Sequence, residues 1–565
     1  MASFVALDDD ADSWQRVAIP VLDLEATPDL LESVSGIVFQ NGGVTAAERT
    51  VWFDRVEAIE NDDEAFMEEV QRATFEFFWQ EANPSNGLIR DRLGAGAASS
   101  IAAVGFGLSA YTVGVDRGWI TRDQAVERVG NTLRFFWNAP QSSAATNVTG
   151  YKGFFYHFLD MNTGYRRGTT ELSTIDTALL LGGVLHVGEY FDAAAAEEEE
   201  IRALDDSIYR RVDWSWAVNN PPLVTLSWKP EEGFSSFDWR GYNEAMIIYI
   251  LGIGSPTHPL DPSAWAQWTS TYRWETHYGF SFVRFPPLFG HQYTHVWIDF
   301  RDIQDDYMRS RNSDYFENSR RATLAQRAYH IANPRNWSNY SRDEWGLTAS
   351  DYPDGYIARG APPAQNDEGT IAPTAPGGSV PFAPDETLAA LRTIKRKYPA
   401  LFGDYGFKDA YNASRFWYSQ QYLGIDEGPI ILMMENHRTG AIWDKTMQNE
   451  HILRGLELAG FRKSTVGTEE TPAVSDEVMS LDVFPNPFSH VATISVSNTR
   501  SAHLRLSVFD ALGRRVATPA DAWYAAGQHI IRWAPDALAN GVYFIRLDAE
   551  GAPAVTSFRS VVLVR

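Results

Sequence analysis

Hydrophobic and polar positions follow a helical period through the middle of the chain. Residues 62–82 place Phe66, Val70, Phe77 and Phe78 on one stripe, with acidic residues in the first turn. Segments 98–118 and 169–185 are apolar nearly all round, which indicates burial on most sides. Polar faces mark most of the other predicted helices, at 122–139, 198–218, 243–254, 319–332, 385–398 and 427–447. The alternation predicts a mainly α region with two helical layers.

The period changes to two at both ends of the chain, which predicts strands. Residues 1–60 contain alternating stretches such as "TVWFDRVEAI" but too few of them to bury both faces of a sandwich. Residues 466–480 are polar and read as a linker. The predicted organisation is a β segment at 1–60, a helical domain at 61–465, the linker 466–480 and a C-terminal β-sandwich at 481–565.

Composition narrows the classes of function. The chain has 565 residues and a net charge of −25, which argues against nucleic acid as a partner. It contains no cysteine, and no apolar run is long enough to span a membrane. Aromatic residues make up 13% and include 19 Trp, enough to line a binding cleft. The long loop 352–382, rich in glycine, proline and aromatics, is typical of loops that build a site.

No cofactor or metal motif is present in the sequence. His291 and His295 are four residues apart in "HQYTH", but this stretch has no glutamate base and no third ligand nearby. The nucleophile elbow and the phosphate-binding glycine loops are also absent. What remains is carboxylates beside aromatics at loop-to-helix junctions. This combination is typical of glycoside hydrolases, in which two carboxyl groups flank the glycosidic bond.

The stretch "FDWRGYNEAMIIYIL" (237–251) places Trp239 and Tyr242 just before Glu244. One interpretation is structural: Asn243 caps the helix and Glu244 favours its dipole. The other is that Glu244 acts as a general acid. That role requires burial under the aromatics, or a neighbouring carboxylate, to raise its pKa against the dipole.

The stretch "TTELSTIDTALLLGGVL" (169–185) presents the same choice. Ser173 and Asp176 have the spacing of a capping box, which is a complete structural explanation for Asp176. Glu171 precedes the cap by two residues and has no part in it. It is therefore freer to point into a cleft.

Several long motifs in order resemble the glucoamylase-like domain of glycoside hydrolase family 144, the endo-β-1,2-glucanases. They are "FGHQYTHVWIDFRD" within 289–334, "EWGLTASDYPDGY" (344–356), "DEGTIAPTAPGGSVPFAP" (367–384), "YGFKDAYN" (405–412) and "YLGIDEGPIILMMENHRTGAIW" (422–443). The resemblance implies an (α/α)6 barrel over about residues 62–460. It also implies inverting hydrolysis of β-1,2-glucan, with no metal or cofactor.

The same resemblance implies roles for individual residues. "ELSTIDTALL" and "GYNEAMIIYIL" match the family's two acidic motifs and assign catalytic roles to Glu171, Asp176 and Glu244. We expect Glu244 to be the acid and either Asp176 or Glu171 the base. Where members often read "GIDQGP", this chain has Glu427, whose charge would raise a neighbour's pKa if it faced the site. The predicted substrate-binding residues are Asp91, Arg92, Trp239, Tyr242, Trp297, Asp299, Arg301, Glu344, Trp345, Asp426 and Glu427.

Other activities are open on the sequence alone. They include an exo-acting or transglycosylating enzyme on β-1,2-gluco-oligosaccharides, a starch-type α-glucanase, and a non-catalytic glycan-binding surface protein. The paired acidic motifs argue against a pure binder, which needs aromatics more than carboxyl pairs. The residues themselves do not separate α from β linkages.

Both end segments resemble known modules. Residues 483–488, "VFPNPF", with "VFDALGRRV" (508–516), "ANGVYFIRL" (539–547) and the terminal Arg565, resemble the sorting domain of type IX secretion substrates. This implies export by that machinery to the cell surface or the medium, with the periplasm and a spacer or adhesion role as alternatives. Residues 1–60 resemble the last strands of a jelly-roll carbohydrate-binding module. We therefore expect a signal peptide and the rest of that module upstream, the alternative being a short β extension.

Overall fold

The computed structural model describes residues 62–94 and 96–464, and most of 479–564 with short gaps between its strands. The predicted β segment 1–60 and nearly all of the linker 466–480 lie outside the described residues. The chain divides into two compact units, with the boundary in the sequence between Lys463 and Ser464. Each unit is described by itself.

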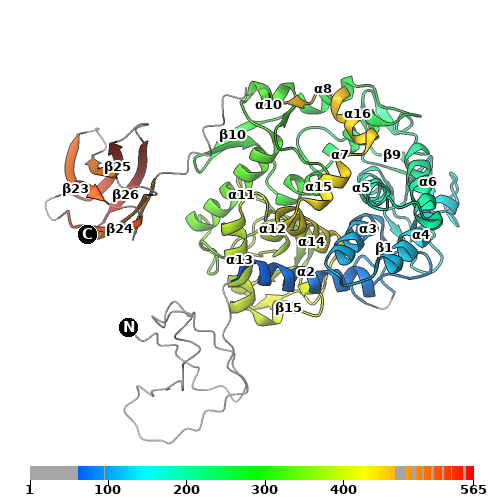
Figure 1. The fold of residues 1–565 in the computed structure, drawn as a ribbon, viewed down its shortest axis with the longest axis horizontal. Helices are drawn as coiled ribbons and strands as arrows, with labels where there is room; N and C mark the ends of the chain where they lie inside the picture. Colours follow the sequence, from blue (N-terminus) through cyan, green and yellow to red (C-terminus); the bar gives the residue numbers. More distant parts are fainter. Residues whose placement is uncertain are drawn as a thin grey trace, which may run out of the picture. The chain divides into compact units, whose positions relative to one another are not determined.

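The first unit is mainly helical, as the sequence predicts. Its interior consists of the helices whose residues are apolar nearly all round (Figure 1). They are α3 (Ile101–Asp116), α5 (Thr174–Tyr190), α7 (Met246–Gly254) and α14 (Gly424–Arg438). Helix α3 packs between α5 and α14, α5 also contacts α7, and the short α9 (Tyr293–Trp297) lies against α5 and α14. Nonpolar contact on every side explains why these segments show no polar face.

A second set of helices buries only one stripe each and covers this interior. They are α2 (Asp63–Gln80), α4 (Arg122–Asn138), α6 (Ala196–Arg210), α11 (Tyr315–Ala332), α13 (Pro384–Lys397) and α16 (Glu450–Leu458). Shorter helices are α8 (Ser263–Thr269), α10 (Asp306–Ser310), α12 (Thr374–Gly377) and α15 (Ala441–Thr446), with 3-10 turns at Leu288–His291, Pro399–Leu401 and Ala413–Arg415. Alternating apolar and amphipathic helices therefore form two layers.

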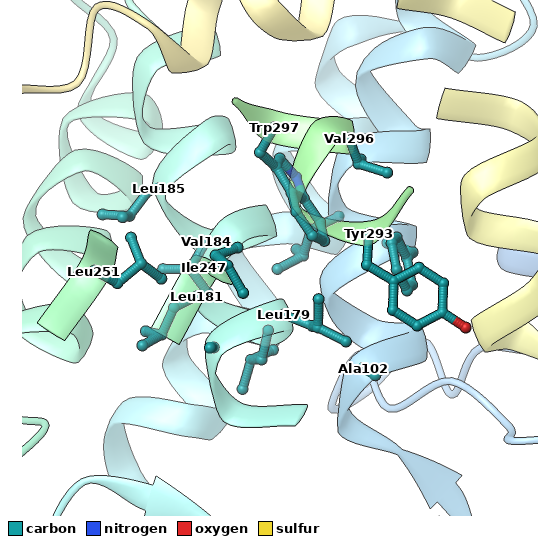
Figure 2. Close-up of a cluster of buried hydrophobic side chains, with 14 of the residues drawn as sticks. Ala102, Leu179, Leu181, Val184, Leu185, Ile247, Leu251, Tyr293, Val296 and Trp297 are labelled. Carbon is teal, nitrogen blue, oxygen red and sulfur yellow. The ribbon is translucent and has the colours of Figure 1, made fainter. Parts of the chain in front are cut away.

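Helices α3 and α5 approach each other closely because each has glycine at the crossing. A side-chain carbon on Gly183 would lie 2.0 Å from the Gly105 carbonyl oxygen, and one on Gly105 would lie 2.3 Å from the Leu179 carbonyl oxygen. Figure 2 shows part of the buried hydrophobic cluster of this unit, to which α5 contributes Leu179, Leu181 and Val184, α7 contributes Ile247 and α9 contributes Trp297.

Short strand pairs hold the N-terminal ends of the interior helices at one face. Strand β1 (Ser99–Ser100) pairs with β4 (Phe158–Leu159) just before α3, and β5 (Leu172–Ser173) pairs with β8 (Ser227–Lys229) just before α5. Arg92 forms a bridge with Leu423, which precedes α14. Backbone hydrogen bonds thus tie the starts of α3, α5 and α14 together, although they are far apart in the sequence.

The remaining strands of this unit are two to four residues long and lie in the connecting loops. They are β2 (Gly150–Tyr151), β3 (Phe154–Phe155), β6 (Val218–Asn220), β7 (Leu223–Val224), β9 (Gly233–Phe234), β10 (Trp274–His277), β11 (Phe280–Val283), β12 (Ile303–Gln304), β13 (Ala349–Tyr352), β14 (Gly355–Ala358), β15 (Phe402–Gly403), β16 (Gly406–Phe407), β17 (Tyr411–Asn412), β18 (Trp417–Tyr418) and β19 (Arg462–Lys463).

Three predicted helices have different ends in the structure. The segment 198–218 stops being helical after Arg210, and 427–447 divides at Gly440, whose φ of 74° a helix does not allow. The helix predicted from Asn243 begins at Met246, and the Asn243 side chain accepts a hydrogen bond from the Ala245 N–H instead.

The second unit contains two antiparallel sheets. One has the order β20 (Met479–Phe484), β21 (Ala492–Asn498), β24 (Gly527–Trp533), and the other β23 (Arg515–Tyr524), β22 (Ala502–Phe509), β25 (Gly541–Glu550), β26 (Val555–Leu563). Both contribute to one hydrophobic core that includes Leu481, Ile494, Leu506, Ile545 and Val561. Across both units, the described helices include none with the length and apolar character needed to cross a membrane.

Candidate active site

Carboxyl groups from distant parts of the sequence come together at the N-terminal ends of the interior helices. Asp176 lies in the first turn of α5 and Asp426 in the first turn of α14. Glu244 precedes α7 by two residues. Asp91 reaches the same face because its carbonyl oxygen accepts a hydrogen bond from Gly424, the first residue of α14. The negative charge of Asp176 acts on both Asp91 and Glu244, so these groups form one electrostatic cluster.

His157 lies between two of the predicted catalytic carboxylates. Its Nδ1 is 2.8 Å from Glu171 and its Nε2 is 3.6 Å from Asp176. The backbone fixes this position, because the His157 N–H donates to the Glu171 carbonyl and its own carbonyl accepts from Ile101 at the start of α3. Burial favours the neutral imidazole, but the charges of Asp176 and Glu171 raise the pKa of His157 to about 9. The ring is therefore cationic at neutral pH.

The two carboxylates beside His157 are held by hydrogen bonds. The hydrogen bond from His157 lowers the pKa of Glu171 to about 2, against the effect of its partial burial. Asp176 accepts a hydrogen bond from the Ser173 hydroxyl at 2.5 Å, while the same oxygen of Ser173 accepts from the Asp176 N–H. Ser173 is thus the cap of α5, as the sequence predicts. Asp176 bonds the cap's hydroxyl, whereas a reciprocal capping box would use the cap's N–H.

Glu244 has the protonation behaviour of a general acid. Burial raises the pKa of Glu244 to about 7, and the negative charge of Asp176 acts in the same direction against a backbone hydrogen bond. The side chain is only half-buried, so solvent still reaches it. Thr294 of α9 donates a hydrogen bond to the Glu244 carbonyl oxygen at 3.2 Å, which fixes the backbone before α7. At neutral pH a substantial fraction of Glu244 carries a proton.

A second set of carboxyl groups lies on the α14 side of the cluster. Arg92 is 3.2 Å from Asp91 and 3.3 Å from Asp351 of β13, and the Asp351 N–H donates to Asp409 at 2.6 Å. Burial and the charge of Asp351 raise the pKa of Asp409 to about 7. Burial and then Asp409 raise the pKa of Asp426 well above its ordinary value. Asp409 is therefore partly protonated at neutral pH, and Asp426 is shifted toward its protonated form.

The structure places several predicted substrate-binding residues away from this cluster. Trp297 is fully buried, stacks on Phe106 with ring centres 5.1 Å apart and donates to Ser109. Trp345 is also fully buried, in a separate apolar core. Neither ring can lie against a sugar, because neither has any exposed surface. The prediction of these two residues as sugar contacts was wrong.

Three other predicted substrate-binding residues have partners within the protein. Glu344 is held by Lys397 at 2.5 Å and Tyr398 at 2.9 Å. Asp299 and Arg301 pair with each other, and the Arg301 guanidinium lies 4.4 Å from the centre of the Trp443 ring.

Two further candidates are buried. The Tyr242 side chain is buried with its hydroxyl 3.4 Å from Ser319. Glu427 is buried, and burial raises its pKa well above the ordinary value, so the departure from "GIDQGP" does not add an exposed charge.

Trp239 remains at the edge of the cluster. Its indole N–H donates to the hydroxyl of Thr174, the first residue of α5, at 2.9 Å, and the ring is partly exposed. Sequence reasoning missed His157 and Asp409. The only available signal was that Asp409 stands within the motif "YGFKDAYN"; His157 carried none.

In this cluster a carboxyl group that holds a proton lies near ionised carboxylates, and solvent reaches the site. Glycoside hydrolases use this combination of carboxyl groups, so the site belongs to that class. Comparison with known proteins agrees with this class. A family model described as "Putative glucoamylase" matches residues 236–450, and one for the secretion system C-terminal sorting domain matches residues 482–560. The chain belongs to the glucoamylase-like family of the glycoside hydrolase family 144 type, and its second unit carries the sorting domain of secreted proteins.

Three relatives illustrate the similarity. An exo beta-1,2-glucooligosaccharide sophorohydrolase (non-reducing end) of Parabacteroides distasonis is 30% identical over 430 residues, which are 70% of this chain and 58% of that protein. The chain thus spans little more than half the length of this curated relative. The endo-beta-1,2-glucanase of Chitinophaga pinensis is 30% identical, covering 71% of this chain and 99% of that one with a TM-score of 0.66. That of Talaromyces funiculosus shares the fold alone, at 12% identity, 70% and 88% coverage and a TM-score of 0.53.

Proposed function

We propose that this protein is a secreted hydrolase that cleaves internal linkages of β-1,2-glucan by inversion. The proposal rests on the pKa of about 7 at Glu244, whose carboxyl group feels the negative charge of Asp176. The imidazolium of His157 faces Asp176 in turn. An inverting glycosidase needs one protonated carboxyl to protonate the leaving oxygen and one carboxylate to activate water. The linkage is supported by the relatives, which act on β-1,2-linked glucans.

In this proposal Glu244 is the acid and Asp176 the base. Glu171 is the weaker candidate for the base, because His157 holds it as an ion pair and its pKa of about 2 makes it a poor proton acceptor. Asp91 and Arg92, with Trp239 at the edge, would contact the glucan. We also propose that the two helical layers close into an (α/α)6 barrel, and that the two sheets of the second unit form a sandwich used by type IX secretion machinery.

Glu244→Gln tests the acid role. It should lose nearly all release of reducing ends from linear β-1,2-glucan, about 100-fold or more, because general acid catalysis contributes that much. It should unfold no more easily than the wild type above pH 7, since burial of an ionised Glu244 opposes folding there. Near-normal turnover in a folded variant would refute the role.

Glu344→Gln is the matched control. It removes a buried carboxylate with firm partners outside the cluster, so it should lower stability and leave turnover per folded molecule unchanged. Asp176→Asn should behave like Glu244→Gln in turnover. A first product with the β anomer would contradict inversion.

An exo mode is the second candidate, because the Parabacteroides distasonis relative is a sophorohydrolase. Products sampled over time separate the two modes. Internal cleavage yields a ladder of oligosaccharides early in the reaction, whereas cleavage from the end yields one disaccharide throughout. Starch and β-1,3-glucan in the same assay test the linkage.

A further inference from the structure

Tyr293 of α9 is a mostly buried tyrosine whose hydroxyl pairs with no residue that the structure describes. The residue is 5% exposed, and its hydroxyl makes no hydrogen bond with any residue that the structure describes. By contrast, the hydroxyls of Tyr111, Tyr209 and Tyr249 donate to backbone carbonyls at 3.1, 2.7 and 2.6 Å. A buried tyrosine normally finds a partner for its O–H. The hydroxyl of Tyr156 also lacks one, but its oxygen is closed to solvent, whereas the Tyr293 oxygen is not among the closed-off atoms.

The surroundings of Tyr293 fix the ring firmly. Phe106 of α3 meets it edge-on at 5.8 Å between ring centres, and Phe289 lies 5.4 Å away. In Figure 2 the ring extends away from the aliphatic cluster, with its hydroxyl at the far end. The next residue, Thr294, bonds the Glu244 carbonyl, so the same short helix that carries Tyr293 is tied to the proposed acid. The hydroxyl is therefore held in place without forming a bond itself.

The charged groups that face this hydroxyl are those of the candidate active site. Burial raises the pKa of Tyr293 well above its ordinary value, and the negative charges of Asp426, Glu244 and Asp176 act in the same direction, as does Tyr356 of β14. These groups come from α14, α5, β14 and the loop before α7. The phenol therefore stays protonated at all physiological pH values. It is a neutral hydrogen-bond donor among carboxyl groups.

We propose that Tyr293 is a substrate-binding residue whose hydroxyl donates a hydrogen bond to the glucosyl unit at the scissile linkage. Sugars carry hydroxyl and ether oxygens that can accept such a bond, and a rigidly held donor aligns the linkage with Glu244 and Asp176. The proposal rests on the proposed glucan-hydrolysing function. It gives a partner to a rigidly held O–H that the described protein leaves unpaired and open to solvent.

Tyr293→Phe tests the proposal, because it removes the hydroxyl alone. We expect kcat/KM on linear β-1,2-glucan to fall about 10-fold or more, as for a lost hydrogen bond in a buried site. The melting temperature should stay equal or rise, since no internal bond is lost. Tyr111→Phe is the matched control: it breaks the bond to the Phe78 carbonyl, so it should lower the melting temperature and leave kcat/KM unchanged.

Two results would overturn the proposal. One is full activity of Tyr293→Phe, and the other is a loss of thermal stability like that of Tyr111→Phe, which would assign the hydroxyl a structural bond. Calorimetric titration of linear β-1,2-glucan into Glu244→Gln and into Glu244→Gln/Tyr293→Phe separates this inference from the catalytic one. Equal affinities of the two variants for the glucan would refute the Tyr293 contact, even if the wild type hydrolyses the glucan. A wild type that binds the glucan but does not cleave it would refute only the proposed function.

Discussion

At the scale of the residue, His157 makes one buried and one half-buried carboxylate compatible with folding. Without a cation, Glu171 and Asp176 would repel each other and would lose favourable hydration. The imidazolium lies within 2.8 Å of one and 3.6 Å of the other. Asp91 adds to the field that keeps the ring charged. The histidine therefore has a positioning role: it orients the proposed base.

His157→Gln should lower stability in a way that depends on pH. The folded pKa of His157 is raised from 6.5 to about 9, so its contribution is complete below pH 6.5 and is lost as pH rises through 9. The pKa of Glu171 is lowered from 4.5 to about 2, so its share is complete above pH 4.5 and is lost as pH falls through 2. We expect a loss of about 1–2 kcal/mol that is largest between these limits.

Urea unfolding of the wild type and of His157→Gln at a series of pH values from 4 to 10 measures this difference. It should be largest near pH 5–6 and shrink toward pH 10. His258→Gln, at a half-exposed histidine 4.0 Å from Asp213, is the control and should change little. A loss that is independent of pH would mean that His157 acts through packing alone.

Some candidate residues could be located from the local sequence pattern, whereas others depend on contacts between distant parts of the chain. Asp176 and Glu244 could be predicted because each stands at the start of an apolar helix, where helix ends meet at one face. Trp297 and Trp345 could not be judged, since an aromatic residue next to a polar loop has the same local pattern whether it faces core or solvent. His157 depends on the pairing of β4 with β1, a contact between strands 58 residues apart that no local period encodes.

At the scale of the element, the close contact of α3 and α5 depends on glycine in both helices. Residue Gly183 faces Gly105 with no room for a methyl group between them. The sequence predicts both helices from their apolar composition, but not which helix each glycine faces. Helix ends were less predictable, because the stop after Arg210 and the break at Gly440 depend on local turns within otherwise apolar or amphipathic stretches.

Gly183→Ala should destabilise the helical unit by about 2–4 kcal/mol, because the new methyl group would overlap the Gly105 carbonyl and push the helices apart. Gly130→Ala on α4 is the matched control. There the nearest atom is the flexible end of Arg134 at 3.2 Å, so better helix propensity should leave stability equal or raise it by up to about 1 kcal/mol. Chemical unfolding of both variants gives the comparison. Equal effects would mean that the crossing can relax.

At the scale of the whole molecule, the carboxyl cluster and the sorting domain belong to separate units. Every group placed in the carboxyl cluster lies between Asp91 and Asp426, within the first unit. Each unit also has its own hydrophobic core, one in the helices and one between the two sheets. Because each unit has a core of its own, each should fold without its neighbour. The second unit would then serve export only.

A chain that ends at Ser464 should therefore keep its activity. We expect kcat/KM on β-1,2-glucan within about twofold of the full chain, because the truncation removes no group of the cluster and no part of its core. The full chain should show two separate thermal transitions, of which the truncated chain retains the one that glucan shifts upward. In a host with type IX secretion, the truncated protein should stay inside the cell envelope. A folded but inactive truncation would show that the sorting unit takes part in hydrolysis, and a single shared transition would show that the two units fold as one.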